Sequence, residues 1–121
     1  MRIINYIFSI AFLLLGSCIS HTFDDLEDIP EMPPELVTYQ DVSSIFEMNC
    51  IACHSSPPQN GAPMSLTTYS DIRNAVLNRG LLDRISREQG APGMMPNGGQ
   101  RLPQSTIDLV FQWNEDGLLE N

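Results

Sequence analysis

Cys50-Ile51-Ala52-Cys53-His54 places two thiols and one imidazole at a spacing that few kinds of protein chemistry require. In a C-x-x-C-H segment, the two sulfurs can add to the two vinyl groups of one porphyrin, and the imidazole then binds the iron as an axial ligand. The segment therefore predicts one covalently attached haem, held through Cys50 and Cys53, with His54 as the first axial ligand.

Two other uses of a C-x-x-C pair agree less well with the rest of the chain. A thioredoxin-like redox pair needs a preceding strand in a βαβ context, and no such pattern is visible in the sequence. A zinc site needs four ligands, and Cys50, Cys53 and the adjacent His54 leave that set incomplete. Haem attachment is the interpretation that uses all three residues.

Residues 1–17 are predicted to be a signal peptide. Arg2 supplies an early positive charge, and Ile3 to Leu15 is mostly apolar but too short to span a bilayer as a helix. Leu15-Gly16-Ser17-Cys18 resembles the lipobox of bacterial lipoproteins, which implies cleavage before Cys18 and lipid on that cysteine. We therefore expect an extracytoplasmic lipoprotein, anchored to a membrane and facing the periplasm or lying on the outer membrane. Ordinary secretion with a free Cys18 thiol is the alternative.

Residues 18–38 are predicted to form an acidic tether. Seven of the fifteen acidic residues lie between Asp24 and Asp41 without a basic residue, and three prolines accompany them. Such a composition buries little apolar surface and favours an extended, solvated chain. His21, inside this segment, is not expected to be a ligand. The chain has a net charge of −9 and no lysine, so nucleic acid is not a predicted partner.

Residues 39–121 are predicted to form one small all-α domain of about four helices wrapped around the haem. Thr38 and Asp41 have the spacing of a capping box, and apolar residues then recur at helical spacing as far as Cys50. Three further helices are expected, near Thr68–Gly80, Leu81–Arg87 and Pro103–Asp116. About 80 residues build only a small side-chain core, so a haem would supply the missing apolar centre.

The inward faces of the later helices follow from the same spacing. Leu82 and Ile85 are expected to face the core from the short third helix. The last helix should bury Ile107, Val110, Phe111 and Asn114, with Trp113 on the adjacent flank. The spacing leaves open whether Pro103 opens this helix or Ser105 caps it.

A methionine is the expected second axial ligand. Met64 follows the C-x-x-C-H segment by ten residues, which is a short path to the other face of a haem. Met94 and Met95 lie about forty residues beyond it, in the glycine- and proline-rich loop Gly90–Gly99. A loop can present a thioether without straining a helix, and on this ground either methionine fits.

Residues 39 to 118 together resemble small monohaem bacterial cytochromes c of class I. The resemblance is carried by the following residues: Val42, Ile45 and Phe46 before Cys50, Cys53 and His54; then Met95-Pro96-Asn97-Gly98-Gly99; then Ile107, Val110, Trp113 and Gly117. It implies a cytochrome c-like fold around one haem c, with Met95 as sixth ligand because Pro96 follows it. It also implies that the Pro63 carbonyl accepts a hydrogen bond from the His54 ring, and that Phe46 lies near Val110 and Trp113.

The resemblance implies electron transfer, not catalysis, because His54 and Met95 would fill both axial positions of the iron. The expected partners are redox donor and acceptor proteins, within a larger respiratory or uptake complex if the domain is a subunit. The alternative is a haem sensor or oxidoreductase subunit with an open or displaceable sixth position. The chain departs from the family at Asn114, where an aliphatic residue is usual. Arg84 and Arg101 are the candidate partners of the haem propionates, and an ordinary position on the surface is the favoured alternative for each.

Overall fold

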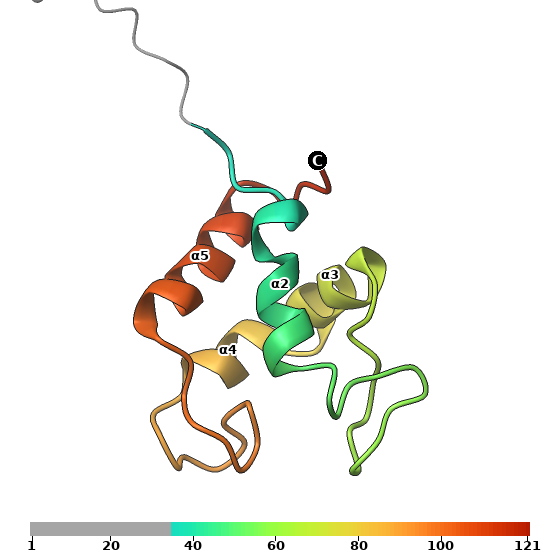
Figure 1. Cartoon of the computed structure of the whole chain (residues 1–121). Coiled ribbons are helices and arrows are strands. Elements are labelled where there is room, and N and C mark those ends of the chain that lie inside the picture. The colour runs from blue at the N-terminus through green and yellow to red at the C-terminus, as the bar shows by residue number, and fades with distance from the viewer. Residues whose placement is uncertain (1–34) are drawn as a thin grey trace, which may run out of the picture. The chain divides into compact units, whose positions relative to one another are not determined.

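A computed structural model describes residues 35–121, and this part of the chain contains four helices and no β-strand (Figure 1). The helices are α2 (Tyr39–Asn49), α3 (Tyr69–Asn78), α4 (Leu81–Ser86) and α5 (Gln104–Glu115). The all-α prediction is confirmed for these residues. The predicted signal peptide, Cys18 and most of the predicted tether, with His21, lie outside the described residues. No helix within residues 35–121 has both the length and the apolar character needed to cross a bilayer.

The first two helices begin at the predicted capping residues. Before α2, the carboxylate of Asp41 accepts hydrogen bonds from the backbone N–H of Thr38 at 2.8 Å and from its hydroxyl at 2.9 Å. These bonds stabilise the charged carboxylate and lower the pKa of Asp41. Before α3, the hydroxyl of Thr68 accepts from the Asp71 N–H at 3.2 Å. Polar groups that a helix start leaves without partners are thus satisfied locally.

The later helices correct the expected inward faces. In α4 the buried residues are Leu81 and Ile85, four positions apart, while Leu82 is only half-buried against the core. In α5 the buried residues are Ile107, Val110 and Trp113, whereas Phe111 and Asn114 are half-buried. Pro103 precedes the first helical residue and Ser105 lies within the helix, so Pro103 opens α5.

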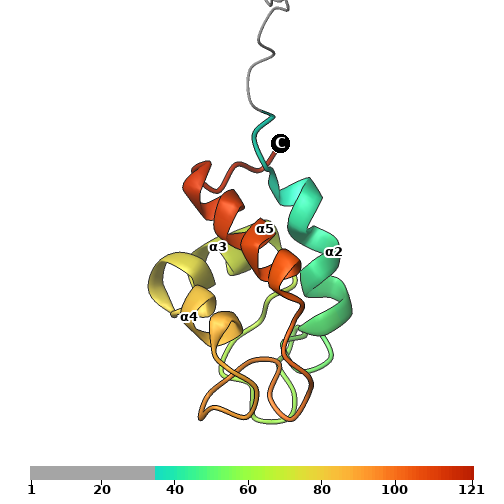
Figure 2. The ribbon, with the colours of Figure 1, turned by 90° about the vertical axis from the view of Figure 1, so that its left-hand side faces the viewer.

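The core lies where α2 packs against α5. The two helices lie side by side in both views (Figures 1 and 2), and they are in contact. Phe46 on α2 and Val110 and Trp113 on α5 belong to the same buried cluster, and Trp113 is 0% exposed. The sequence prediction that put Trp113 on a flank is therefore wrong. The tryptophan is covered because Tyr39 and Tyr69 lie against its ring, with centroids 6.1 and 6.4 Å away.

The end of the chain closes the domain over this tryptophan. The indole N–H of Trp113 donates to the Leu119 carbonyl at 2.8 Å, and the same carbonyl accepts from the Tyr39 N–H at 2.8 Å. The hydroxyl of Tyr69 donates to the Leu118 carbonyl at 2.8 Å. These bonds fix the start of α2, the start of α3 and the end of the chain at one end of the domain. The two long loops, after α2 and after α4, lie at the opposite end (Figures 1 and 2).

Candidate functional site

A cavity of about 620 Å³ lies between the two long loops and the helices that carry them. Small-molecule and cofactor sites commonly fall in this size range. Its lining includes five residues that the sequence predicts for the haem site: Cys50, Cys53, His54, Pro63 and Met95. Apolar side chains supply much of the remaining wall, namely Phe46, Leu66, Leu81 and Ile85.

The C-x-x-C-H segment forms a tight turn at the end of α2. The N–H of Cys50 donates to the Phe46 carbonyl at 2.8 Å, and the N–H of His54 donates to the Cys50 carbonyl at 2.9 Å. Cys50 and Cys53 do not form a disulfide with each other. Burial raises the pKa of the Cys50 thiol to about 11, so this thiol is protonated at neutral pH. Because the backbone hydrogen bonds fix this turn, both sulfurs lie at the cavity in a fixed position relative to the imidazole.

The imidazole of His54 has one nitrogen engaged and one nitrogen available. The side chain is 8% exposed, and its Nδ1 lies 2.8 Å from the carbonyl oxygen of Met64. A carbonyl oxygen only accepts, so Nδ1 carries a proton, and in the neutral ring Nε2 then has the lone pair that can bind a metal. Such a bond also fixes the orientation of the ring.

This hydrogen bond corrects the expectation for Pro63. Pro63 lines the cavity, but the carbonyl that meets the histidine ring belongs to the next residue, Met64. The reason lies in the loop, because the Leu66 N–H donates to the His54 carbonyl at 2.8 Å. That bond draws the chain back beside His54 and brings the Met64 carbonyl to the ring.

The two adjacent methionines have different environments. Met95 lines the cavity, whereas Met94 is 6% exposed and is not part of the lining. The backbone holds both of them, since the Met94 N–H donates to the Ala91 carbonyl and the Met95 N–H donates to the Arg84 carbonyl, each at 3.0 Å. Met95 is therefore the loop methionine whose position suits a ligand in the cavity, whereas Met94 is buried and does not line it.

The arginines also differ in whether they line the cavity. Arg79 and Arg84 line the cavity, whereas Arg101 does not. Arg101 instead donates to backbone carbonyls at the end of α4, so only one of the two predicted propionate partners is at the cavity. Sequence reasoning missed Arg79. Arg79 follows Ile72 by seven residues and Val76 by three, so helical spacing puts it on the same inward face as those two residues. This spacing was the signal that could have placed Arg79 at the cavity.

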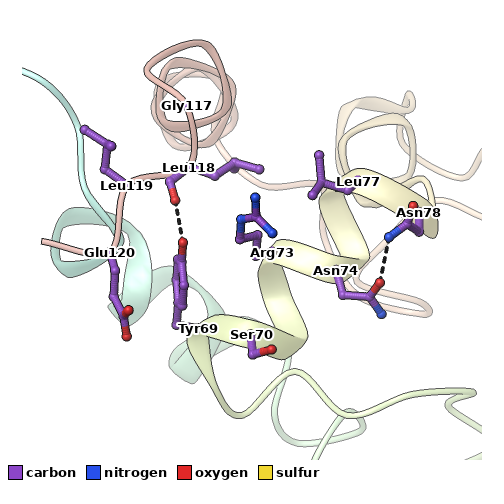
Figure 3. A pocket seen from close by; sticks show the side chains of 10 residues that line it. All are labelled: Tyr69, Ser70, Arg73, Asn74, Leu77, Asn78, Gly117, Leu118, Leu119 and Glu120. Carbon is purple, nitrogen blue, oxygen red and sulfur yellow. Dashed lines mark hydrogen bonds between the residues drawn. The ribbon is translucent and has the colours of Figure 1, made fainter.

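A second hollow of about 420 Å³ lies between α3 and the end of the chain (Figure 3). Arg73 and Leu77 line it from α3, and Leu119 and Glu120 line it from the C-terminal segment. Figure 3 shows the hydrogen bond from Tyr69 to Leu118 at its edge. None of its lining residues is a cysteine, histidine or methionine. This hollow therefore lacks the soft sulfur and imidazole donors that the first cavity contains.

The donor set of the first cavity fits a haem. Two thiols can form covalent bonds to a porphyrin, an imidazole nitrogen is free for iron, and a thioether shares the same space. The chain matches no protein-family model, and neither curated proteins nor solved structures gave a match to it. The chemistry of this site is thus inferred from its own residues and contacts.

Proposed function

We propose that this protein transfers electrons through one covalently attached haem c, with His54 and Met95 as the axial ligands of the iron. One observation carries the proposal. A single apolar-walled cavity is lined by Cys50, Cys53, His54 and Met95, although the methionine comes from a loop about forty residues further along the chain. A haem c needs this combination of donors, in which sulfur holds the porphyrin and a nitrogen and a thioether bind the iron.

Several residues of the cavity would hold such a group. Cys50 and Cys53 would hold it by thioether bonds, so that it cannot dissociate. His54 offers Nε2, and the Met64 carbonyl on Nδ1 fixes the ring and increases its basicity. The guanidinium groups of Arg79 and Arg84, both at the cavity, are suited to bind carboxylates of the bound group. When bound, the haem supplies one-electron exchange at its iron.

The proposal favours electron transfer over catalysis because two protein ligands leave the iron no position for a substrate. His/Met ligation also favours the reduced state and raises the reduction potential. The partners would be redox donor and acceptor proteins, in a larger respiratory or uptake complex if the domain is a subunit. Attachment to a membrane outside the cytoplasm, through lipid on Cys18, is part of the same proposal and concerns a residue outside the described part of the chain.

A matched pair of substitutions tests the ligand assignment. Met95→Ala should abolish the methionine-to-iron charge-transfer band of the oxidised protein. Met94→Ala should keep that band, because Met94 is buried beside the cavity and does not line it. Loss of the band in Met94→Ala and its retention in Met95→Ala would contradict the assignment.

Carbon monoxide separates this proposal from the sensor alternative. With Met95 on the iron, the reduced protein should not bind carbon monoxide in the absence of denaturant. The Met95→Ala variant should bind it readily, since the substitution opens the sixth position. Binding to the unmodified protein would instead indicate a displaceable ligand and a sensor-like role.

A further inference from the structure

Side chains of three arginines hold the irregular loop that carries Met95, together with the backbone bonds of Met94 and Met95. Arg84 donates from Nη1 to the Gly93 carbonyl at 3.2 Å, and Arg87 donates from Nη1 to the Pro92 carbonyl. Arg101, at the other end of the loop, donates to the Ser86 carbonyl at 3.4 Å and to the Arg87 carbonyl at 3.1 Å. The Ser86 and Arg87 carbonyls lie at the C-terminal end of α4, where the helix dipole favours a positive charge.

Two further contacts hold the arginines themselves. Nη2 of Arg87 lies 2.6 Å from Oδ2 of Asp83, one turn earlier in α4, and this pair lowers the pKa of Asp83. The backbone N–H of Arg101 donates to the side-chain oxygen of Gln89 at 2.6 Å, and the Gln89 amide donates to the Gly99 carbonyl at 3.1 Å. Both ends of the loop are therefore tied to α4 and to each other.

Gly93 shows how closely the guanidinium groups approach the loop. A Cβ at this position would lie 2.4 Å from Nη1 of Arg84 and 2.6 Å from Nη1 of Arg87. The residue also has φ +75°, a conformation that favours glycine. Met95 is two residues further on, so the arginine contacts are made on the segment that leads directly into the cavity.

We propose that Arg87 and Arg101 are positioning residues that hold this loop and thereby keep the Met95 thioether on the haem iron. The inference rests on the proposed function, because it concerns the same sixth ligand. Neither arginine lines the cavity, so each acts on the iron only through the loop. Removing either one should raise the rate at which Met95 leaves the iron, while the ligand itself is unchanged.

The test is displacement of Met95 by added imidazole in the oxidised holoprotein, followed through loss of the methionine-to-iron band. The imidazole nitrogen replaces the thioether on ferric iron, and no electron is transferred. At saturating imidazole, the observed rate of imidazole binding equals the rate at which the methionine leaves the iron. Arg87→Gln and Arg101→Gln should each raise it about tenfold, the effect of losing a hydrogen bond worth about 1.4 kcal/mol. Asp83→Asn, which leaves all the arginines in place, should raise it about two- to threefold.

Two control variants separate positioning of the loop from other effects. Arg73→Gln removes the same charge from α3, where the side chain lines the second hollow, and should leave the rate unchanged. Val76→Ala removes a half-buried side chain that packs on the core, and it should lower global stability without changing the rate. Equal acceleration by Val76→Ala would show that the rate follows overall stability, and it would overturn the inference.

The two proposals fail in different ways. Unmodified protein without a covalent haem or without the methionine-to-iron band overturns the proposed function. A normal band in the unmodified protein, together with unchanged imidazole rates in Arg87→Gln, Arg101→Gln and Asp83→Asn, overturns only the role of the arginines. If one arginine variant does not accumulate as holoprotein, the other and Asp83→Asn carry the same test.

Discussion

The two sides of the cavity are built differently. The histidine side, residues 50–66, continues directly from α2 and is fixed by hydrogen bonds between backbone groups, such as Cys50 to Phe46 and Leu66 to His54. The methionine side, residues 84–101, contains a long irregular loop. Backbone hydrogen bonds such as Met95 to Arg84 hold part of this loop, and side chains that donate to backbone carbonyls hold the rest, among them Arg87 and Arg101.

This difference has a consequence for the proposed haem ligands. Backbone hydrogen bonds do not depend on which side chains are present, and covalent attachment through Cys50 and Cys53 would reinforce the histidine side. Bonds from long, partly exposed side chains are weaker and can be removed one at a time. Loops held in this way are also the parts of a protein that open most easily. We therefore expect the sixth ligand to leave the iron faster than the fifth, although it remains bound in the unmodified protein.

The largest expected effect comes from the histidine side. Changing both Cys50 and Cys53 to serine should abolish covalent haem, because a serine hydroxyl does not add to a vinyl group. Met95→Ala should leave the amount of covalent haem unchanged, since attachment does not involve that side chain. Haem staining after denaturing electrophoresis measures both variants. Covalent haem in the double serine variant would contradict attachment of the haem through the histidine side.

A second comparison uses one buried side chain from α2, which leads into the histidine side, and one from the methionine side. Phe46→Ala, at a residue 2% exposed on α2, should lower the free energy of unfolding by about 3–5 kcal/mol. Met94→Ala, at a residue 6% exposed in the loop, should cost about 2 kcal/mol but should accelerate imidazole binding more than Phe46→Ala does. Denaturant unfolding and imidazole kinetics together measure this, with Leu77→Ala, an exposed position, as control. The reverse order for imidazole kinetics would contradict the account.

The smallest expected effect concerns pH and the start of α2. Hydrogen bonds from Thr38 lower the pKa of Asp41 in the folded protein, so the ionised carboxylate stabilises the fold. That contribution is complete above the unfolded pKa of about 4 and is lost as the pH falls through the lower folded value. Asp41→Asn should therefore be slightly less stable than the unmodified protein at pH 7 and equally stable near pH 2. A difference in stability that persists at pH 2 would contradict this origin.

Much of the fold was predictable because it depends on short-range patterns. Capping residues Thr38 and Thr68 and the apolar spacing that follows them gave the positions of α2 and α3. Helical spacing alone put Trp113 on a flank, whereas the resemblance placed it near Phe46, in whose buried cluster it lies. Its complete burial depends on the chain end returning to its indole and on two tyrosine rings from other helices. Contacts between distant backbone groups leave no periodic signal in a sequence.

The candidate site also contains residues that the sequence predicted and contacts that it did not predict. Cys50, Cys53 and His54 were predicted from their order and Met95 from the family resemblance, in which a proline follows the ligand; all four line one cavity. The acceptor for His54 was assigned one residue away from its position, since an irregular loop has no period that distinguishes Pro63 from Met64. Arg101 was taken for a partner of the haem or a surface residue, whereas its bonds go to carbonyls at the end of α4. Backbone acceptors look alike at every position of a sequence, so such contacts need the three-dimensional structure.

The central claim is that one haem is attached through both cysteines of Cys50-Ile51-Ala52-Cys53-His54. A pyridine haemochrome spectrum of the unmodified protein, made in a host that attaches haem to such segments, tests this most directly when combined with the intact mass of the denatured chain. We expect one haem per chain and a spectrum in which both vinyl groups are saturated. A chain without haem, or a haem that acidic solvent extracts with its vinyl groups intact, would contradict it.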